Sequence, residues 1–565
     1  MYLKQIVIHN FRGIIDTSIH LQNYSLIVGS NNAGKTTIFD ALRAFYEKDG
    51  FKFNKKDHFP LKGNTDEESW IELLFKLTKT ESQSLKEEYR LPNNKLRVRK
   101  YFLTSLKNKE GSIFAYDSSN KLSENPFYGA KNVQSGKFGD LIYIPAVSKV
   151  DDHAKLSGPS ALRDLITNVM SSVVDSSDSY AKLHDNVTTF AEEITTIETD
   201  DNLSLKGFED DLNEMLSPWQ TKFQLKFSTP STAEIIKSML SYDIQDIHHE
   251  ASHNIEYFGS GFQRHFIYSL INLKSKYAPS KVTDKSKDFK PKFTILLFEE
   301  PEAFLHPPQQ NYLAKNLMTL NKSVGWQVIC STHSSHFVSK STDKIPAIIR
   351  AQRESGIVKT FQIDAERWDS LIDSNQVIND IVKKFPKLKK TLQSDDLKPD
   401  MEIIKYFLWL NSDRSSIFFA NYVLLVEGPS EASLFSKLID DGKLNLPHGT
   451  YVLDAMGKFN FHRFMSLLGF MGIKHSVIYD DDSEKDHHAE INKLINDSRN
   501  NFTIEIQKIE KDLESCLSLP APGNAHRKPQ HVLFYYSTNQ IDEEKLNTLC
   551  SLVESCFRKH NDKAD

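Results

Sequence analysis

Residues Gly29 to Thr36, GSNNAGKT, fit the phosphate-binding pattern G-x-x-x-x-G-K-[ST]. The apolar run YSLIV at 24–28 predicts a buried strand before the pattern, and the spacing of residues 34–47 predicts a helix after it. In such a loop, backbone N–H groups curl around phosphate oxygens, the lysine reaches the β- and γ-phosphates, and the hydroxyl binds Mg²⁺. The order predicts an α/β domain that binds ATP through Gly29, Asn32, Gly34, Lys35, Thr36 and Thr37.

A strand that ends in two acids is the expected partner of this loop. The run FTILLF at 293–298 leads into Glu299 and Glu300, and a third strand, WQVIC at 326–330, leads towards His333. Ligands bind at the carboxyl ends of parallel strands. We therefore expect Glu299 to support Mg²⁺ through water, Glu300 to polarise the attacking water and His333 to contact the γ-phosphate. Exposed charges at a strand end and a structural histidine are the simpler alternatives.

Three more acidic clusters follow apolar runs nearer the C-terminus. They are Glu427 and Glu431 in VLLVEGPSEASLF (423–435), Asp454 in YVLDAMGKFNF, and Asp480, Asp481 and Asp482 in VIYDDDS. Parallel strands place their carboxyl ends side by side, so acids there converge and repel one another unless a hard cation binds. We expect Glu427, Glu431, Asp454, Asp480 and Asp482 to bind Mg²⁺ or Mn²⁺, a site that can act on a phosphodiester. A strand-end glutamate followed by a strand-end D-x-D is the pattern of the Toprim fold.

Weaker candidates lie further along the chain. KIEKDLESCL contains Asp512 and Glu514, which could complete a second metal site, and HRKPQHVLF contains Lys528, a cation that could stabilise transition-state charge. An ordinary helix face explains the two acids equally well. The run SEKDHH is better explained as a solvated loop, and the lysines between 383 and 390 as either phosphate contacts or a charged linker.

Length and composition limit the classes of protein that can carry these sites. A chain of 565 residues predicts two or more domains, and its net charge of −5 excludes a generally basic nucleic-acid coat. Its 4 cysteines are scattered without a CxxC pair, which excludes a disulfide framework or a zinc module. No apolar run reaches the ~20 residues that span a bilayer, and the N-terminus lacks the layout of a signal peptide. We therefore expect a cytoplasmic protein without a membrane segment.

The segment GSGFQRHF at 259–266 resembles the signature of ABC-type ATPases, with Ser260, Gly261 and Gln263 at its key places. In that superfamily the signature contacts the nucleotide held by the other subunit, so the resemblance implies paired ATPase heads. NFRG at 10–13 looks like the opening of the recombination-repair and structural-maintenance branch, in which an insertion separates loop and signature. The chain departs from the superfamily at Glu299, where an Asp usually stands.

The predicted fold is α/β, an ABC-type ATPase head with a helical insertion followed by a C-terminal Toprim (Rossmann-like) domain. The two parts of the ATPase are expected at 1–150 and 251–380, on either side of a helical insertion at 151–250 that is expected to form a dimer. A polar, lysine-containing linker at 381–415 and the Toprim domain at 416–565 complete the chain.

This combination resembles the OLD (overcoming lysogenisation defect) family of ATP-dependent nucleases, which includes the nuclease subunit of the Gabija anti-phage system. The motifs that carry the resemblance are EEPEAFLHP, STHSSHF, VLLVEGPSEASLF and DLESCL. The resemblance implies nicking or cleavage of double-stranded DNA under ATP control, in bacterial anti-phage defence. Glu427, Asp480, Asp482, Asp512 and Lys528 would be its catalytic residues. It also implies a homo-oligomer, a dimer or tetramer of ATPase heads, with a helicase or another defence-system protein as a candidate partner.

Three other functions stay open from the sequence. A DNA-repair-type ABC ATPase could bind nucleic acid through a Toprim domain that does not cleave it. A strand-transferring or primase-like enzyme could use the same acids, although no zinc module is available for a primase. A protein whose ATPase heads chiefly bind a partner is the third.

Overall fold

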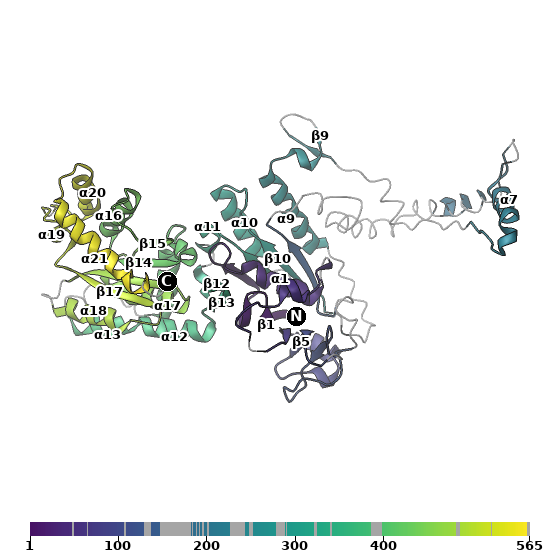
Figure 1. The fold of residues 1–565 in the computed structure, drawn as a ribbon, viewed down its shortest axis with the longest axis horizontal. Helices are drawn as coiled ribbons and strands as arrows, with labels where there is room; N and C mark the ends of the chain where they lie inside the picture. Colours follow the sequence, from purple (N-terminus) through teal and green to yellow (C-terminus); the bar gives the residue numbers. More distant parts are fainter. Residues whose placement is uncertain are drawn as a thin grey trace. The chain divides into compact units, whose positions relative to one another are not determined.

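The computed structural model describes residues 1–561 with several gaps, which are 48–49, 65, 107–108, 129–136, 147–181, 183–184, 188, 191–192, 195–196, 200–202, 226–242, 248–251, 278–288, 290, 321–324, 340–341, 386–397, 482–485 and 521. Two compact units divide the chain, one made of residues 1–146 and 287–565 and the other of residues 147–286 (Figure 1). None of the helices that the structure describes is long and apolar enough to cross a bilayer.

A mostly parallel sheet carries the phosphate-binding loop. In the described part of the chain its strand order is β13-β12-β3-β11-β10-β7, and only the β12–β13 pair is antiparallel. Its strands are β3 (Tyr24–Val28), β7 (Asp140–Ile144), β10 (Thr294–Glu299), β11 (Trp326–Ser331), β12 (Ile348–Glu354) and β13 (Ile357–Gln362). All five residues of β3 are buried, as the continuous apolar run predicts for a central strand.

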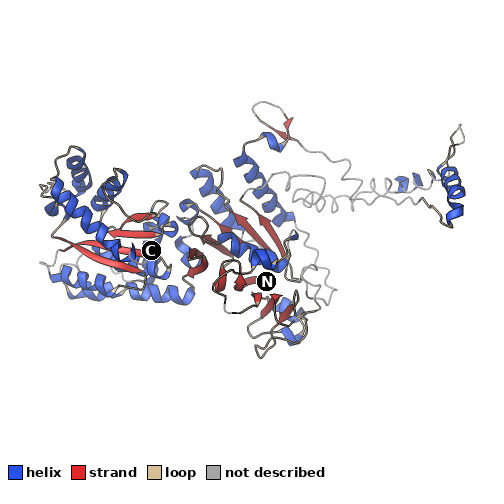
Figure 2. Ribbon diagram, viewed as in Figure 1, coloured by secondary structure: helices blue, strands red, loops and turns tan. Residues whose placement is uncertain are grey.

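A second, antiparallel sheet shares a hydrophobic core with the first. Its order is β2-β1-β4-β5-β6, made of β1 (Tyr2–Phe11), β2 (Ile14–His20), β4 (Ser69–Lys76), β5 (Lys95–Leu103) and β6 (Ile113–Ala115). Helices α1 (Lys35–Tyr46), α2 (Lys55–His58), α3 (Lys79–Ser84), α10 (Pro307–Leu320) and α11 (Ser335–Ser339) accompany these sheets (Figure 2). The predicted strand–loop–helix around Gly29 is therefore confirmed.

The C-terminal part contains a fully parallel sheet of order β15-β14-β16-β17. Its strands are β14 (Tyr422–Val426), β15 (Thr450–Asp454), β16 (Lys474–Asp481) and β17 (Thr503–Glu510). Helices α16 (Pro429–Asp440), α17 (Phe461–Phe470), α18 (Asp486–Asp497), α19 (Leu513–Cys516), α20 (Lys528–Ser537) and α21 (Glu543–Asn561) follow or connect the strands (Figure 1). This sheet is the predicted second α/β unit, and its apolar runs at 422–426, 450–453 and 475–479 all form strands.

The region expected to be a linker, 381–415, differs from a solvated connection. It contains the end of α13 (Val377–Lys384), all of α15 (Pro399–Trp409) and the start of the 3-10 helix η7 (Arg414–Phe419), next to α12 (Ala365–Asn375). Tyr406 is fully buried, and the buried carboxylate of Glu402 accepts two hydrogen bonds, of 2.7 and 2.9 Å, from Arg463. The two residues of that ion pair are 61 positions apart in the sequence. The polar composition of the segment alone therefore does not indicate that it packs.

The second unit contains few described elements. They are α7 (Leu205–Leu216), β8 (Ile244–Gln245), β9 (Ser252–His253) and α9 (Ser260–Tyr277), with the 3-10 helices η3 (Ser217–Trp219) and η4 (Ile255–Tyr257). No residue of α7 is buried. Residues 251–286, expected in the second part of the ATPase, group with the insertion in this unit. Most of the predicted insertion, 151–250, lies outside the described residues.

Candidate functional site

The phosphate-binding loop has the backbone geometry that its glycines allow. Gly29 and Gly34 have φ angles of +144° and +98°, which L side chains rarely adopt. A Cβ on Gly29 would lie 2.3 Å from the carbonyl oxygen of Ala351, and one on Gly34 would lie 2.6 Å from Cγ2 of Val358. The loop therefore packs directly against β12 and β13, without room for larger residues.

Lys35 lies inside this loop at the start of α1. Its ammonium donates hydrogen bonds of 3.0 Å to the carbonyls of Gly29 and Ser30, and the side chain is buried. Burial lowers the pKa of Lys35 to about 8, although the charges of Glu300, Glu302 and Glu299 act to raise it. Thr36 is exposed beside it. The loop therefore holds a buried lysine close to three acids.

The acids predicted at the end of β10 lie where the sequence indicates. Glu299 ends the strand, is buried, and accepts a 2.9 Å hydrogen bond from the hydroxyl of Tyr143. Its other oxygen, Oε1, has no hydrogen-bond partner among the described residues. Glu300 follows in a left-handed conformation, with φ of +43°, and its Oε1 lies 3.4 Å from Nε2 of His333. The three predicted residues Glu299, Glu300 and His333 are thus gathered at one edge of the sheet.

Glu302 belongs to this group and was not predicted. Its buried carboxylate accepts a 2.6 Å hydrogen bond from the backbone N–H of His333 and so fixes the loop after β11. Burial raises the pKa of Glu302, and the nearby charge of Glu300 adds to the effect. The sequence feature that could have indicated this role is the third acid of FEEPE, because an acid just after a strand end can reach the neighbouring loop.

The predicted signature residues lie in the second unit. Ser260 begins α9, Gly261 follows it, and the side-chain amide of Gln263 donates a 2.7 Å hydrogen bond to the carbonyl of Phe258. That bond fixes the segment in front of the helix. The role of these residues towards a nucleotide stays a prediction.

Glu427 and Asp480 meet at the carboxyl edge of the parallel C-terminal sheet. Glu427 follows the buried strand β14, and Asp480 lies near the end of the adjacent strand β16. The backbone N–H of Asp480 lies 3.4 Å from Oε2 of Glu427. The backbone carbonyl of Glu427 accepts a 2.8 Å hydrogen bond from Gly457, which comes after β15. Three strand ends therefore converge on Glu427.

Glu431 is buried in the first turn of α16. Its Oε2 accepts a 3.0 Å hydrogen bond from the backbone N–H of Gly428. Burial raises the pKa of Glu431 to about 7, and the charges of Glu427 and Glu514 also raise it, against the hydrogen bonds to backbone N–H groups. Glu431 therefore lies close enough to Glu427 and Glu514 to feel their charges.

Glu514 and Lys528 form the far side of the same acidic group. Oε2 of buried Glu514 accepts a 3.0 Å hydrogen bond from the ammonium of Lys528, while Oε1 has no hydrogen-bond partner in the described chain. Burial lowers the pKa of Lys528, but Glu514, Asp512 and Asp480 outweigh it and the net shift is upward. Asp512 caps α19 by accepting a 2.8 Å hydrogen bond from Ser515. The predicted acids and lysine thus interact as one group.

Of the predicted metal ligands, Asp454 stands apart from this group. Asp454 ends β15, but one of its oxygens lies 3.0 Å from Arg414 and the other accepts a 2.6 Å hydrogen bond from the N–H of Met456. A metal would have to compete with these contacts. Asp482 lies outside the described residues. Its neighbour Asp481 binds Lys508 at 2.7 Å and Asn492 at 3.2 Å.

Lys458 is a buried cation that the sequence analysis did not single out. It begins the 3-10 helix η8 (Lys458–Asn460), donates a hydrogen bond to the backbone carbonyl of Asp480, and lies 5.1 Å from the ring centroid of Tyr479. It therefore holds the end of β16 in place. The sequence feature that could have indicated this lysine is the glycine before it. Gly457 has φ of +105°, and the turn at this glycine brings Lys458 to the end of β16.

The chemistry of the acidic group fits a divalent cation. Hard cations take carboxylate oxygens, and the group offers Glu427, Glu431, Asp480 and the unpaired Oε1 of Glu514. As they are placed, the described side chains include no set of three acids, histidines or cysteines close enough to hold a metal together. Asp482, the remaining ligand predicted for this site, lies outside the described residues.

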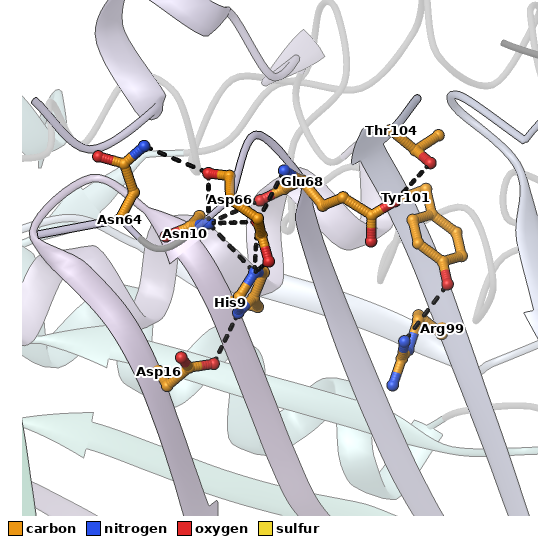
Figure 3. Close-up of polar contacts among 9 residues, drawn as sticks. All are labelled: His9, Asn10, Asp16, Asn64, Asp66, Glu68, Arg99, Tyr101 and Thr104. Atoms are coloured by element: carbon orange, nitrogen blue, oxygen red, sulfur yellow. Dashed lines mark hydrogen bonds and ion pairs between the residues drawn. The ribbon is translucent and has the colours of Figure 1, made fainter. Parts of the chain in front are cut away.

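A separate polar cluster lies on the antiparallel sheet (Figure 3). Nδ1 of His9 lies 2.6 Å from Asp16, and Nε2 lies 3.0 Å from Asp66. The ring stacks on Trp70 at 4.9 Å. Burial lowers the pKa of His9, but the hydrogen bonds and charges of Asp16 and Asp66 outweigh it and raise the pKa overall. Because the acids bind opposite nitrogens, the cluster suits an imidazolium and not a metal.

Comparison with known families confirms the predicted pair of domains. A family model described as "AAA ATPase domain" matches residues 1–122 and 107–338. A model described as "Overcoming lysogenization defect protein-like, TOPRIM domain" matches residues 418–482. The second match contains Glu427, Glu431, Asp454, Asp480 and Asp482.

Individual relatives match most of the chain. Old nuclease of Escherichia phage P2 is 25% identical over 499 residues, covering 85% of this chain and 77% of that protein. Endonuclease GajA of Bacillus cereus strain VD045 is 25% identical over 499 residues, covering 85% and 75%. Among solved structures, an SMC head bound to the C-winged helix domain of ScpA aligns with a TM-score of 0.37 and 13% identity, over 66% of this chain and 100% of that one.

Proposed function

We propose that this chain, which belongs to the AAA ATPase domain family and to the OLD family of nucleases, is a nucleotide-regulated, divalent-metal-dependent DNA endonuclease. The observation that carries the proposal is the 3.4 Å approach of the Asp480 backbone to the Glu427 carboxylate, beside buried Glu431 and Glu514. Acids on separate elements meet there although burial and mutual repulsion oppose it. The substrate we propose is double-stranded DNA.

In this proposal the acids bind metal and Lys528 acts at the phosphate. Mg²⁺ or Mn²⁺ would be held by Glu427, Glu431, Asp480 and Asp482, with Asp454, Asp512 and Glu514 as ligands of a second ion, and would supply Lewis-acid activation of a phosphodiester. Lys528 would lie against the negative charge that develops there. Lys458 holds the end of β16, so that Asp480 keeps its position beside Glu427.

The ATPase part would sense nucleotide. We assign phosphate binding to Lys35 and the loop amides, Mg²⁺ binding to Thr36 and Glu299, orientation of the attacking water to Glu300, and contact with the γ-phosphate to His333. Ser260, Gly261 and Gln263 would contact the nucleotide of a second copy, which makes the active form a dimer or tetramer of heads. Light scattering with and without ATP measures that assembly.

The decisive experiment incubates supercoiled plasmid with the protein and Mg²⁺ or Mn²⁺, with and without ATP. Asp480→Asn should lower nicking at least tenfold, and Glu427→Ala should abolish it. Asp481→Asn is the matched control, because the carboxylate of Asp481 is bound by Lys508 and Asn492. Equal nicking by Asp480→Asn and Asp481→Asn would contradict the proposed site.

The same assay separates the nuclease from a protein that binds DNA without cleaving it. Gel-shift binding with no metal-dependent nicking would favour the binding protein. Lys35→Ala should change only the response to ATP. A role in anti-phage defence predicts that expression lowers plaque formation and that Glu427→Ala restores it. Co-purification from the native host tests for a helicase or another defence-system protein as partner.

A further inference from the structure

The strand beside the phosphate-binding loop carries a buried arginine that reaches into the C-terminal sheet. β12 pairs with β3 so that Arg350 lies opposite Val28, the last residue before the loop. The next carbonyl, that of Ala351, lies where a side chain on Gly29 would be. Arg353, on the same strand, donates a 3.1 Å hydrogen bond to Asn32 of the loop. β12 therefore contacts the phosphate-binding loop through both its backbone and a side chain.

Arg350 is only 3% exposed, and its guanidinium binds mainly backbone carbonyls. Four acceptors lie in the C-terminal part, the carbonyls of Phe418 (3.2 Å), Ala420 (3.0 Å), Met471 (3.2 Å) and Gly472 (3.1 Å), and the fifth is Gln352 (2.9 Å). Burial lowers the pKa of Arg350 to about 10, so it stays charged at neutral pH. A planar guanidinium with five donors can hold such a set, whereas a lysine has three.

These carbonyls stand at the starts of the two strands that carry the nuclease acids. Phe418 and Ala420 precede β14, which leads to Glu427, and Met471 and Gly472 precede β16, which leads to Asp480. At about 3.3 Å per residue, the five residues of β14 extend about 17 Å. The held ends and the acids are thus opposite ends of the same two strands.

Two further contacts connect strands β12 and β13 to the start of β16. The ammonium of Lys474, at the start of β16, lies 3.0 Å from Glu354 at the end of β12. Gly472 has φ of +67°, and a Cβ there would lie 2.5 Å from the ring of Phe361 on β13. The hairpin β12–β13 thus packs against the start of β16 without free space.

A second contact leads from the nucleotide site to the start of β14. Phe419 lies between the two residues whose carbonyls Arg350 holds, and its ring stacks with that of His333, with centroids 6.4 Å apart and planes at 27°. His333 also lies 3.4 Å from Glu300 and is held through its backbone by Glu302. A ligand that moves the His333 ring would therefore change its contact with Phe419.

We infer that Arg350 and Phe419 are positioning residues that transmit the state of the nucleotide site to Glu427 and Asp480, an inference that rests on the proposed function. Arg350 connects the starts of β14 and β16 to β12, which contacts the phosphate-binding loop. Phe419 is the movable contact, which senses His333. In this proposal Phe419 would take a different arrangement when nucleotide is bound, which supplies the two discrete states that such coupling requires.

The test compares Phe419→Leu with Phe419→Tyr in the full chain. Hydrogen exchange of segments 422–427 and 474–481 is measured with and without a non-hydrolysable ATP analogue and Mg²⁺. The wild type and Phe419→Tyr should show a nucleotide-dependent change, which Phe419→Leu should reduce at least threefold while its affinity for the analogue stays within twofold. Phe557→Leu, which removes a ring packed on Tyr422, is the control and should keep the change. A full response in Phe419→Leu, or none in the wild type, overturns the inference.

Plasmid nicking provides the second readout. The ratio of nicking rates with and without nucleotide should fall to within about twofold of one in Phe419→Leu, while Phe557→Leu keeps the wild-type ratio. Arg350→Lys should raise the Mn²⁺ concentration for half-maximal nicking at least threefold with an unchanged KM for DNA; an unchanged Mn²⁺ requirement contradicts its role. If the wild type shows the exchange response but does not nick plasmid, the coupling stands and the proposed nuclease function is wrong. If the wild type nicks plasmid without an exchange response, the nuclease function stands and the coupling is wrong.

Discussion

The ammonium of Lys528 lies 3.0 Å from Oε2 of Glu514, between elements that both follow the last strand of the C-terminal sheet. The lysine is half-exposed and the glutamate is buried, so the pair presents a positive charge beside the acidic group. In the proposed function, a phosphodiester bound at this group would lie close to this charge.

Replacing Lys528 with glutamine should lower metal-dependent nicking by about tenfold to a hundredfold, because one group that stabilises the developing charge is lost. The rate is measured on supercoiled plasmid at saturating Mn²⁺. Lys508→Gln removes the same charge from a lysine that pairs with Asp481, and it should retain wild-type nicking. Equal losses in the two variants would mean that only overall charge matters.

Glu431→Gln should stabilise the metal-free protein at pH 8. The folded-state pKa of Glu431, about 7, is above its ordinary value of 4.5, so its contribution to stability is complete below 4.5 and is lost as the pH rises through 7. The loss is on the order of 3 kcal/mol at most. Glutamine keeps an acceptor for the N–H of Gly428. In EDTA, the Tm of Glu431→Gln should therefore exceed that of the wild type at pH 8, with a smaller difference at pH 5.

Divalent cations should reverse this order. If Glu431 is a ligand, Mn²⁺ raises the Tm of the wild type and has a smaller effect on Glu431→Gln. A variant that is less stable than the wild type at pH 8 in EDTA, or that gains as much from Mn²⁺, would remove Glu431 from the proposed site.

The positions of Glu299, Glu427 and Asp480 could be predicted from the sequence because each follows a continuous apolar run. Such a run forms a buried strand, and the parallel arrangement then brings the acids to one edge. The same argument placed the phosphate-binding loop before α1. Local pattern is sufficient wherever a side chain's position follows from the strand that carries it.

Arg350, Lys458 and Glu402 could not be placed in this way. Arg350 and Lys458 bind backbone carbonyls, which every residue has, so their acceptors carry no signature in the sequence. The partner of Glu402 is 61 residues away, and its segment was therefore interpreted as a linker. Contacts that join distant elements through common groups become visible only in the folded chain.

The stability contributed by His9 should fall as the pH rises. The folded-state pKa of His9 is above its ordinary value of 6.5, so the contribution is complete below 6.5 and is lost as the pH rises through the folded-state value. The groups that face the ring are Asp16, Asp66, Asn10 and Trp70. The Tm deficit of His9→Gln should be larger at pH 6 than at pH 8.5, by about 2 °C. A deficit that does not depend on pH would mean that packing on Trp70 dominates.

Gly34→Ala should weaken ATP binding at least tenfold. The new methyl group would lie 2.6 Å from Cγ2 of Val358 and the backbone has φ of +98°, so the loop has to shift away from its phosphate-binding form. Binding is measured by titration with a fluorescent ATP analogue. Nicking without nucleotide should persist, because Gly34 lies in the ATPase part.

Gly442→Ala is the matched control for that substitution. Gly442 also has a positive φ, +69°, but a Cβ there meets nothing within 4 Å. The two variants share backbone strain and differ in the clash with Val358. If both bind ATP like the wild type, the loop tolerates the displacement; if Val358→Ala added to Gly34→Ala restores part of the affinity, the contact with β13 is what holds the loop in shape.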